Sequence, residues 1–250
     1  MSPRLQFALE AARVAGESTL GLFRNPEGFE LKSDHSPVTA ADKRAEEIIR
    51  ERVEKHFPGE TVLGEEQGLT GQGLDRWVID PIDGTKSFIA GVPLYSTLLS
   101  WEEGGEPVLG VTDFPALGFT VYAEKGGGAF CNGEPCRVQD VADLSRAIIC
   151  HGSLKSLRQY GRLDSSTDLG SKALAVKGWS DAYGHMLVAT GRAHLMIDPV
   201  VSRWDLSAVA VIVREAGGVF SDFSGGRAIT NEAISCVPGL YGEVMEAFRA

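Results

Sequence analysis

Three β-type segments follow one another between Leu94 and Val121, and they constrain the fold more than any other feature. The segments read YSTLLSWEEG, EPVLGVTDF and LGFTVYAEKGGGAF, with Gly and Pro between them. Short runs of β-branched and aromatic residues punctuated by turn residues are typical of consecutive hairpins. The sequence therefore predicts an antiparallel sheet in the first half of the chain.

Helical patterns precede this sheet. Apolar residues at helical spacing predict an amphipathic helix from about Leu5 to Arg24, directly before an Asn-Pro pair. Thr39 has the position of the N-cap of a second helix that runs to about His56, and Asp42 that of the acid of its capping box. The run WVID, before the hairpins, indicates a short buried strand.

Strand and helix signals alternate after residues 133–143, the expected join between two halves. AIICHG, HLMID and GVFSDFSG indicate strands, and DAYGHMLVATGRA and WDLSAVAVIVREAGG indicate helices. This order favours an α+β protein of stacked sheets and helices over the regular alternation of a doubly wound fold. We expect an N-terminal half, residues 1–140, and a C-terminal half, residues 141–250, within one compact unit.

Composition excludes several classes of partner. The formal net charge of −10 argues against nucleic acid, and an acidic protein that handles an anion needs metal cations to offset its field. No apolar run approaches the ~18 residues of a membrane span, and the N-terminal stretch lacks the apolar core of a signal peptide. The four cysteines form no C-x-x-C pair. These features predict a cytoplasmic protein with reduced thiols and no membrane contact.

The stretch VIDPIDGTKSF, residues 78–88, holds the first candidate site. Pro81 favours extended backbone at Asp80, and Gly84 permits a turn with positive φ. The turn can direct Asp80, the Ile82 carbonyl and Asp83 at one point, and oxygen is the ligand that Mg²⁺ prefers. A plain surface turn is the alternative interpretation, because Asp, Pro and Gly are common turn residues.

Further acids stand apart from this stretch. Glu65 and Glu66 follow a glycine and could be a solvated loop or a ligand pair. Asp205 has the position of a helix N-cap in WDLSAVAVIVREAGG, where it could act as a cap or be a rigidly held ligand. Taken singly, each acid is ambiguous.

The strings GEE, DPIDGT and WDLSAVAVIVREAGG, in that order, resemble the inositol monophosphatase superfamily. Together with LVATGRA, the resemblance extends from about residue 5 to 235. It implies a layered αβαβα sandwich of the inositol monophosphatase and fructose-bisphosphatase type. It also implies a phosphate monoester hydrolase, a homodimer, that uses two to three Mg²⁺ ions to shield the phosphate and activate water.

The resemblance also implies roles for individual residues. Three groups are expected: metal ligands, a water-activating pair with an acid behind it, and contacts to the substrate. The metal ligands are Glu65, Asp80, the Ile82 carbonyl, Asp83 and Asp205; the catalytic residues are Asp42, Thr85 and Glu66; the substrate-binding residues are Asp83, Gly84, Thr85, Asp181 and Asp198.

The substrate is expected to be a small phosphorylated metabolite. DGTKSF, DAYG and the spacing D-P-x-x-x-x-W-D are most similar to the histidinol-phosphate phosphatase branch. An inositol-1-monophosphatase and a nucleotide 3′-phosphatase acting on 3′-phosphoadenosine 5′-phosphate are the alternatives. A fourth interpretation is a non-catalytic metal-binding scaffold that kept the fold.

Several residues remain open at this stage. Tyr183 could line a site for an imidazole, and His185 could approach the substrate or fill the core. Arg203 could face the phosphate or pair with a surface acid. The polar loop from Lys32 to Asp42 could close over the site or be an ordinary exposed loop.

Overall fold

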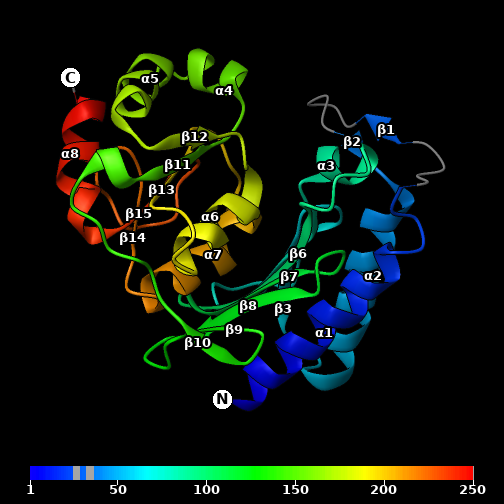
Figure 1. The fold of residues 1–250 in the computed structure, drawn as a ribbon. Coiled ribbons are helices and arrows are strands. Elements are labelled where there is room, and N and C mark those ends of the chain that lie inside the picture. Colours follow the sequence, from blue (N-terminus) through cyan, green and yellow to red (C-terminus); the bar gives the residue numbers. More distant parts are fainter. Residues whose placement is uncertain (25–28, 32–36, 250) are drawn as a thin grey trace.

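Two β-sheets alternate with three layers of helices (Figure 1). The computed structural model describes residues 1–24, 29–31 and 37–249. Within these residues the expected αβαβα order is confirmed. The helices of the layers, in order across the molecule, are α1 (Pro3–Thr19) and α2 (Ala40–His56), then α6 (Asp181–Ala189) and α7 (Arg203–Glu215), then α5 (Leu163–Lys172) and α8 (Pro238–Arg249).

The larger sheet has eight strands in the order β10-β9-β8-β7-β6-β5-β3-β4. The predicted hairpins are confirmed, since β6 pairs antiparallel with β7 and β7 with β8. Only the β3–β5 pair of this sheet is parallel. The strands are β3 (Thr61–Gly64), β4 (Gly68–Thr70), β5 (Arg76–Asp83), β6 (Ser96–Glu103), β7 (Glu106–Phe114), β8 (Phe119–Glu124), β9 (Ala129–Cys131) and β10 (Glu134–Cys136).

The smaller sheet has five strands in the order β12-β11-β13-β15-β14. Strand β11 pairs parallel with β12 and β13, whereas β15 pairs antiparallel with β13 and β14. The strands are β11 (Ile148–His151), β12 (Ala175–Lys177), β13 (Leu195–Asp198), β14 (Val219–Ser221) and β15 (Ala233–Cys236). The irregular segment 137–143 leads from the larger sheet to this one.

Short elements complete the described part of the chain. They are β1 (Glu30–Leu31), β2 (Pro37–Val38), α3 (Thr85–Ile89), η1 (Leu144–Arg146) and α4 (Leu154–Gln159). No helix within residues 1–24, 29–31 and 37–249 is long and apolar enough to cross a membrane.

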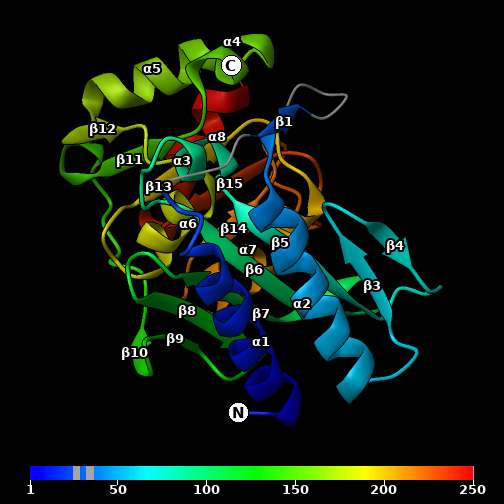
Figure 2. The same cartoon turned by 90° about the vertical axis from the view of Figure 1, so that its right-hand side faces the viewer.

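Helices α1 and α2 lie side by side on the outer face of the larger sheet (Figure 2). Helix α1 presents a stripe of buried alanines, among them Ala8 and Ala12, which lets the helix approach the sheet closely. Ile49 and Val53 of α2 join the same core together with Trp77 of β5. Because the side chains of the stripe are small, the aromatic rings of the strands fill the space beneath it.

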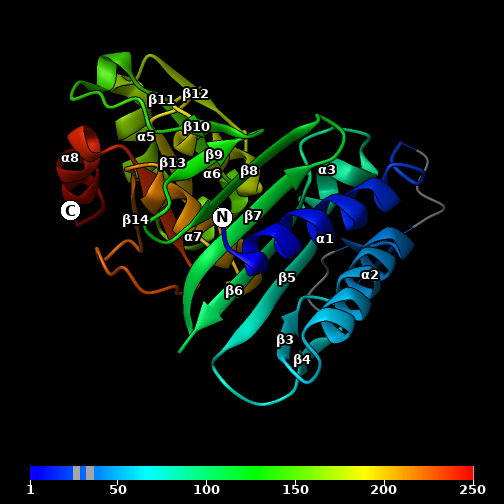
Figure 3. The same ribbon diagram turned by 90° about the horizontal axis from the view of Figure 1, so that it is seen from below.

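Helices α6 and α7 cover the opposite face of the larger sheet (Figure 3). Helix α7 approaches β7 so closely that a Cβ atom at Gly110 would lie 2.6 Å from the Cα and carbonyl oxygen of Ala208. The residues Leu206 and Val209 of α7 are fully buried there. A glycine on the strand therefore sets how near this helix can lie to the sheet.

The ends of two predicted helices are wrong. Helix α1 ends at Thr19 rather than Arg24, because the N–H groups of Leu22 and Phe23 both bond the Thr19 carbonyl at 3.0 Å in irregular turns and Arg24 takes a left-handed φ of 69°. Helix α6 ends at Ala189, since Gly191 takes the left-handed φ of 73° that terminates helices.

Candidate active site

The DPIDGT motif begins within β5 and ends in α3. The strand is longer than predicted and continues through Pro81, where its pairing with β6 shifts register between Asp80 and Asp83. Such an irregularity redirects side chains locally. Gly84 follows with φ 81°, as predicted, and is the N-cap of α3. A Cβ atom there would lie 3.0 Å from the Leu94 carbonyl oxygen, so the turn needs a glycine for space as well as for backbone angle.

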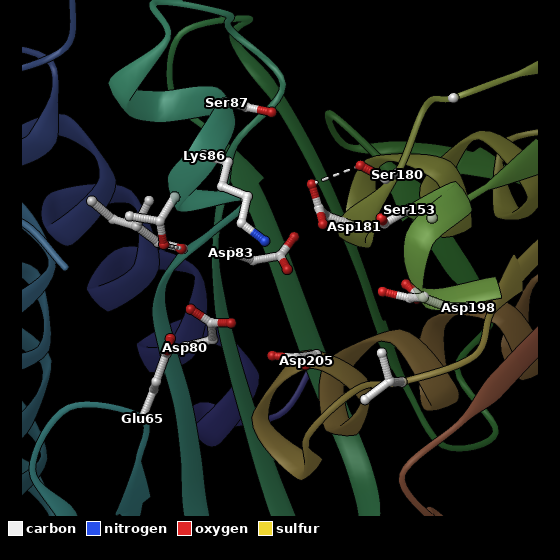
Figure 4. Close-up of a pocket in the computed structure, with 17 residues that line it drawn as sticks. Glu65, Asp80, Asp83, Lys86, Ser87, Ser153, Ser180, Asp181, Asp198 and Asp205 are labelled. Atoms are coloured by element: carbon white, nitrogen blue, oxygen red, sulfur yellow. Dashed lines mark hydrogen bonds between the residues drawn. The ribbon is translucent and has the colours of Figure 1, made fainter. Parts of the chain in front are cut away.

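Three aspartates converge in front of β5, two from the DPIDGT motif and one from the distant start of α7. Asp80, Asp83 and Asp205 each offer a carboxylate oxygen, and these oxygens all lie within 4.8 Å of one another. Figure 4 shows Asp205 approaching from its helix while Asp80 and Asp83 project from the strand, with Glu65 beside them. The predicted gathering of these acids is therefore what the fold produces.

Asp205 reaches this cluster from a position other than the one expected. The N-cap of α7 is Ser202, and Asp205 is the third residue of the helix, where its carboxylate accepts the Ser202 N–H at 2.7 Å. The prediction of Asp205 as N-cap is wrong, because Ser202 and Asp205 form a capping box. One carboxylate oxygen thus fixes the helix start while the group still lies at the cluster.

The acidic cluster is electrostatically strained. Burial, followed by the charges of Glu65 and Asp83, raises the pKa of Asp80 well above its usual value. Burial and the charge of Asp181 do the same to the pKa of Asp83. The pKa of Asp205 is raised to about 6, mainly by burial. Like charges held together out of water favour protons or cations nearby.

The observed donors suit a divalent cation. All of them are oxygen, and Asp80 Oδ1 is buried without a hydrogen-bond partner in the part of the chain that the structure describes. A buried carboxylate oxygen left without a donor is costly unless a cation meets it. Carboxylates at this spacing are ligands for Mg²⁺ rather than for a soft metal.

Asp42 and Thr85 meet beside this cluster. The Thr85 hydroxyl donates to the Ile82 carbonyl at 3.0 Å and lies 3.4 Å from Asp42 Oδ1. Asp42 is fully buried, and its Oδ2 accepts the N–H and the hydroxyl of Thr39 at 2.8 and 2.5 Å. The predicted capping box of α2 is therefore confirmed, and Asp42 also contacts Thr85.

The acidic cluster forms one wall of the site, and a second wall faces it. Asp181 and Asp198 line it (Figure 4), and Asp198 belongs to β13 of the smaller sheet. Burial raises the pKa of both, and for Asp198 the neighbouring charge of Asp181 adds to the effect. The two walls are joined directly, because the Ala182 N–H donates to Asp83 Oδ2 at 2.8 Å. Asp181 itself has a left-handed φ of 57°, which aspartate tolerates better than most residues.

The walls enclose a pocket of about 450 Å³. Lys86 points into it from α3, and serines lie along its second wall, a contribution that the sequence did not reveal because loop serines carry no pattern. The lining comprises Glu65, Asp80, Ile82, Asp83, Gly84, Thr85, Lys86, Ser87, Gly152, Ser153, Ser156, Gly178, Ser180, Asp181, Asp198, Val200 and Asp205.

Two other residues considered from the sequence are outside the lining of this pocket, although His185 borders a smaller cavity that Asp83, Asp181, Asp198 and Asp205 also line. Tyr183 is not among the described residues lining this pocket; its ring packs edge-on against Phe114 at 5.5 Å. His185 is buried, with Nδ1 2.7 Å from the Ser235 hydroxyl, and burial lowers its pKa to about 3.

Three more assignments concern the borders of the site. Arg203 binds the buried acid Glu102 rather than a surface acid. Glu66 is outside the pocket lining and donates its backbone N–H to Glu46. The loop from Lys32 lies largely outside the described residues, so its closure remains a prediction.

Comparison with known proteins identifies the family. The chain belongs to the Inositol monophosphatase family, whose sequence model matches residues 1–249. It is thus a metal-dependent phosphomonoesterase, a hydrolase with an acidic cation site. In fold it is similar to the Thermotoga maritima IMPase, with a TM-score of 0.92 at 32% identity over 99% of this chain and 97% of that one. The suhB protein of Bartonella henselae also gives 0.92, at 28% identity over 99% of both chains.

Curated relatives match over most of their length. A histidinol-phosphatase of Chlorobaculum parvum is 45% identical over 92% of this chain and 89% of that protein. Histidinol-phosphatases of Streptomyces coelicolor and Mycobacterium tuberculosis are 39% and 37% identical, over 88% and 89% of this chain and 87% and 88% of theirs. A Thermotoga maritima fructose-1,6-bisphosphatase/inositol-1-monophosphatase is 36% identical over 90% of this chain and 87% of that protein.

Proposed function

We propose that this phosphatase hydrolyses L-histidinol phosphate to L-histidinol and phosphate, a step of histidine biosynthesis. The observation that carries the proposal is the pair of carboxylates on the second wall, Asp181 and Asp198, which line the same pocket as the cluster of Asp80, Asp83 and Asp205 without belonging to that cluster. L-Histidinol phosphate brings an ammonium group and an imidazole besides its phosphate, whereas inositol phosphate offers only hydroxyls. The names of the three histidinol-phosphatase relatives support the same choice.

The metal site uses the oxygens gathered around β5. Glu65, Asp80, the Ile82 carbonyl, Asp83 and Asp205 would hold two to three Mg²⁺ ions. When bound, Mg²⁺ offsets the charge of the cluster and of the phosphate, and acts as a Lewis acid towards the phosphoryl group.

The chain's own residues prepare the attacking water. Thr85 directs its hydroxyl proton to a carbonyl or carboxylate, Ile82 or Asp42, and its oxygen lone pairs remain for the proton of a water in the pocket. Burial raises the pKa of Asp42 although Thr39 donates to it, which suits a group that takes up a proton from water through Thr85. Glu66, next to Glu65 in the sequence, would act as a supporting acid.

Positioning of the substrate falls to both walls. The N–H groups of Gly84 and Thr85 at the start of α3 would donate hydrogen bonds to phosphate oxygens, and Asp83 would contact the substrate beside them. Asp181 and Asp198 would accept hydrogen bonds from the ammonium group, and such charge-assisted contacts are about twice as strong as neutral ones. Lys86 points into the same space and would balance the charge of the second wall.

The proposal is tested by comparing kcat/KM for three substrates with the same purified protein. L-Histidinol phosphate should exceed inositol 1-phosphate and 3′-phosphoadenosine 5′-phosphate by about tenfold to a thousandfold, the range that one or two specific polar contacts provide. Preference for either competitor would refute the choice of substrate and leave the phosphatase assignment in place. Absence of Mg²⁺-dependent phosphate release from any phosphate ester would instead favour a metal-binding scaffold.

We also propose that the enzyme is a homodimer, as the family resemblance implies. Light scattering coupled to size-exclusion chromatography measures this directly. A monomer mass at micromolar concentration would contradict the proposal.

A further inference from the structure

A buried glutamate lies where the first turn of α7 meets the larger sheet. Glu102 of β6 is 0% exposed. Its Oε1 accepts hydrogen bonds from the Ser207 hydroxyl at 2.7 Å and from Arg203 Nε at 2.8 Å, and its Oε2 accepts one from Arg76 Nε at 2.8 Å. Charged donors on a carboxylate that is shielded from water hold their partners in a narrow range of positions.

Two of these partners flank the metal-site residue of α7. Arg203 precedes Asp205 by two positions and Ser207 follows it by two. Arg203 also donates through its guanidinium to the Gly105 carbonyl, just past the end of β6. The first turn of α7 is therefore attached to the sheet on both sides of Asp205, which fixes the rotation of the helix as well as its height.

The same glutamate lies on β6, the strand that pairs with β5, and β5 carries Asp80 and Asp83. In the antiparallel pair of β5 and β6, Glu102 lies opposite Arg76, and Leu98 lies opposite Asp80. Thus Glu102 and Asp80 belong to one two-stranded ladder. The distance from Asp205 to Asp80 and Asp83 then depends on how α7 is attached to that ladder.

We propose that Glu102 is a positioning residue for the metal site, which acts through Arg203 and Ser207 to hold Asp205 at cation-binding distance from Asp80 and Asp83. The inference rests on the proposed role of these three aspartates as ligands. Glu102 is absent from the pocket lining, so it touches neither substrate nor cation. Residues that orient ligands from behind typically change metal affinity or activity by about 10–100-fold when they are replaced.

The test measures Mg²⁺ binding to the full chain by isothermal titration calorimetry, with Mn²⁺ binding by electron paramagnetic resonance as a second readout. Arg203→Gln should weaken Mg²⁺ binding about tenfold, and Arg203→Lys and Ser207→Ala should weaken it less. Excess Mg²⁺ should restore kcat to within about twofold of wild type, because the ligands themselves are intact.

Arg76→Gln is the matched control. Arg76 donates to the same carboxylate at the same 2.8 Å but from β5, so its loss leaves both attachments of α7 in place. This variant should lose thermal stability without metal to a similar extent as Arg203→Gln, and should bind Mg²⁺ like wild type.

Unchanged Mg²⁺ affinity in folded Arg203→Gln, or in Arg203→Lys and Ser207→Ala should the first variant not fold, would overturn the inference. An equal loss of affinity in Arg76→Gln would overturn it too, since general weakening of the sheet would then be the cause. A wild-type protein that binds no Mg²⁺ would reject the ligand assignment itself, and this inference with it.

Discussion

The hydroxyl of Thr85 lies 3.4 Å from Oδ1 of Asp42, so the first turn of α3 meets the first turn of α2 beside the acidic cluster. The other oxygen of Asp42 is occupied by Thr39. This leaves Oδ1 as the oxygen that faces Thr85. In the proposed mechanism, this arrangement provides a path for a proton from the pocket to a buried carboxylate without any large movement.

Replacement of Thr85 tests this path. Thr85→Val should lower kcat by about 10²–10⁴-fold with little change in KM, because a positioned acid–base group is removed while the side-chain volume is kept. Thr85→Ser keeps the hydroxyl and should retain most of kcat. Steady-state kinetics at saturating Mg²⁺ measures both variants, and a defect in KM alone for Thr85→Val would assign the hydroxyl to phosphate binding instead.

Asp83→Asn tests whether the acidic cluster binds Mg²⁺. Wild-type protein at Mg²⁺ near 100 times its Kd should gain about 2.7 kcal/mol in free energy of unfolding, and the variant should lose most of this gain together with turnover. Asp168→Asn is a suitable control, because Asp168 is exposed on α5 in the outer layer. Thermal melts with and without Mg²⁺ give the comparison. A folded Asp83→Asn protein with near-normal Mg²⁺ stabilisation would reject Asp83 as a ligand.

Asp198→Asn tests the second wall. The variant should lose much of its preference for L-histidinol phosphate, about tenfold or more in kcat/KM, because an ammonium group then meets a neutral amide. Hydrolysis of a generic aryl phosphate should change far less and serves as the internal control. Equal losses on both substrates would show that Asp198 supports the site as a whole rather than the choice of substrate.

The close approach of α7 to β7 predicts a large effect from a single methyl group. Gly110→Ala would place Cβ 2.6 Å from the backbone of Ala208, so the helix must move, at a typical cost of about 1–3 kcal/mol in stability. The same substitution at Gly242 in α8 meets no atom within 4 Å and should stabilise the protein by up to about 1 kcal/mol. Urea unfolding compares the two, and equal stabilities would contradict the packing described.

His194 predicts a pH-dependent contribution to stability. Its Nδ1 accepts the Ile148 N–H at 2.9 Å, and burial lowers its pKa below the ordinary 6.5. Above about pH 6.5 the ring is neutral in both folded and unfolded chains, so its titration does not lower the free energy of unfolding. As the pH falls below that value, His194 binds a proton in the unfolded chain but not in the folded chain, so the free energy of unfolding decreases.

His194→Asn isolates this contribution, because the asparagine oxygen can still accept the Ile148 N–H. Thermal melts between about pH 7.5 and 5.5 should show a smaller loss of stability on acidification in the variant than in wild type. Identical pH dependence in the two proteins would exclude His194 as a source of acid sensitivity.

Local patterns predicted the hairpins β6–β8 well, because short turns bring consecutive strands side by side. Local patterns failed where contacts between residues far apart in the sequence determine an element or its end. Helix α1 stops at Thr19, whose hydroxyl lies 2.9 Å from the Tyr95 hydroxyl, a contact that no local pattern contains. The strand β15 and the helix α8 were not predicted, because their partners lie on the smaller sheet, far from them in sequence.

The acids of the candidate site were predicted from a motif, whereas their supports were not. Glu46 and Glu102 look like solvated charges in sequence, yet both are fully buried. Glu46 accepts Arg50 Nε at 2.7 Å and the Glu66 N–H at 2.7 Å, and so holds the turn that carries Glu65. Only the folded chain shows that each glutamate meets an arginine, because burial of a charge depends on its tertiary partner.

The two walls of the pocket come from separable stretches of chain. One comprises residues 65–87 with Asp205, and the other residues 152–156 and 178–181 with Asp198. With the proposed roles, hydrolysis and choice of leaving group are encoded in different stretches, so substitutions in the second set would change the preferred substrate and leave the cation-binding residues unchanged. For redesign, the second set contains the residues to exchange. The hydrogen bond from the Ala182 N–H to Asp83 has to be kept, because it connects the two walls.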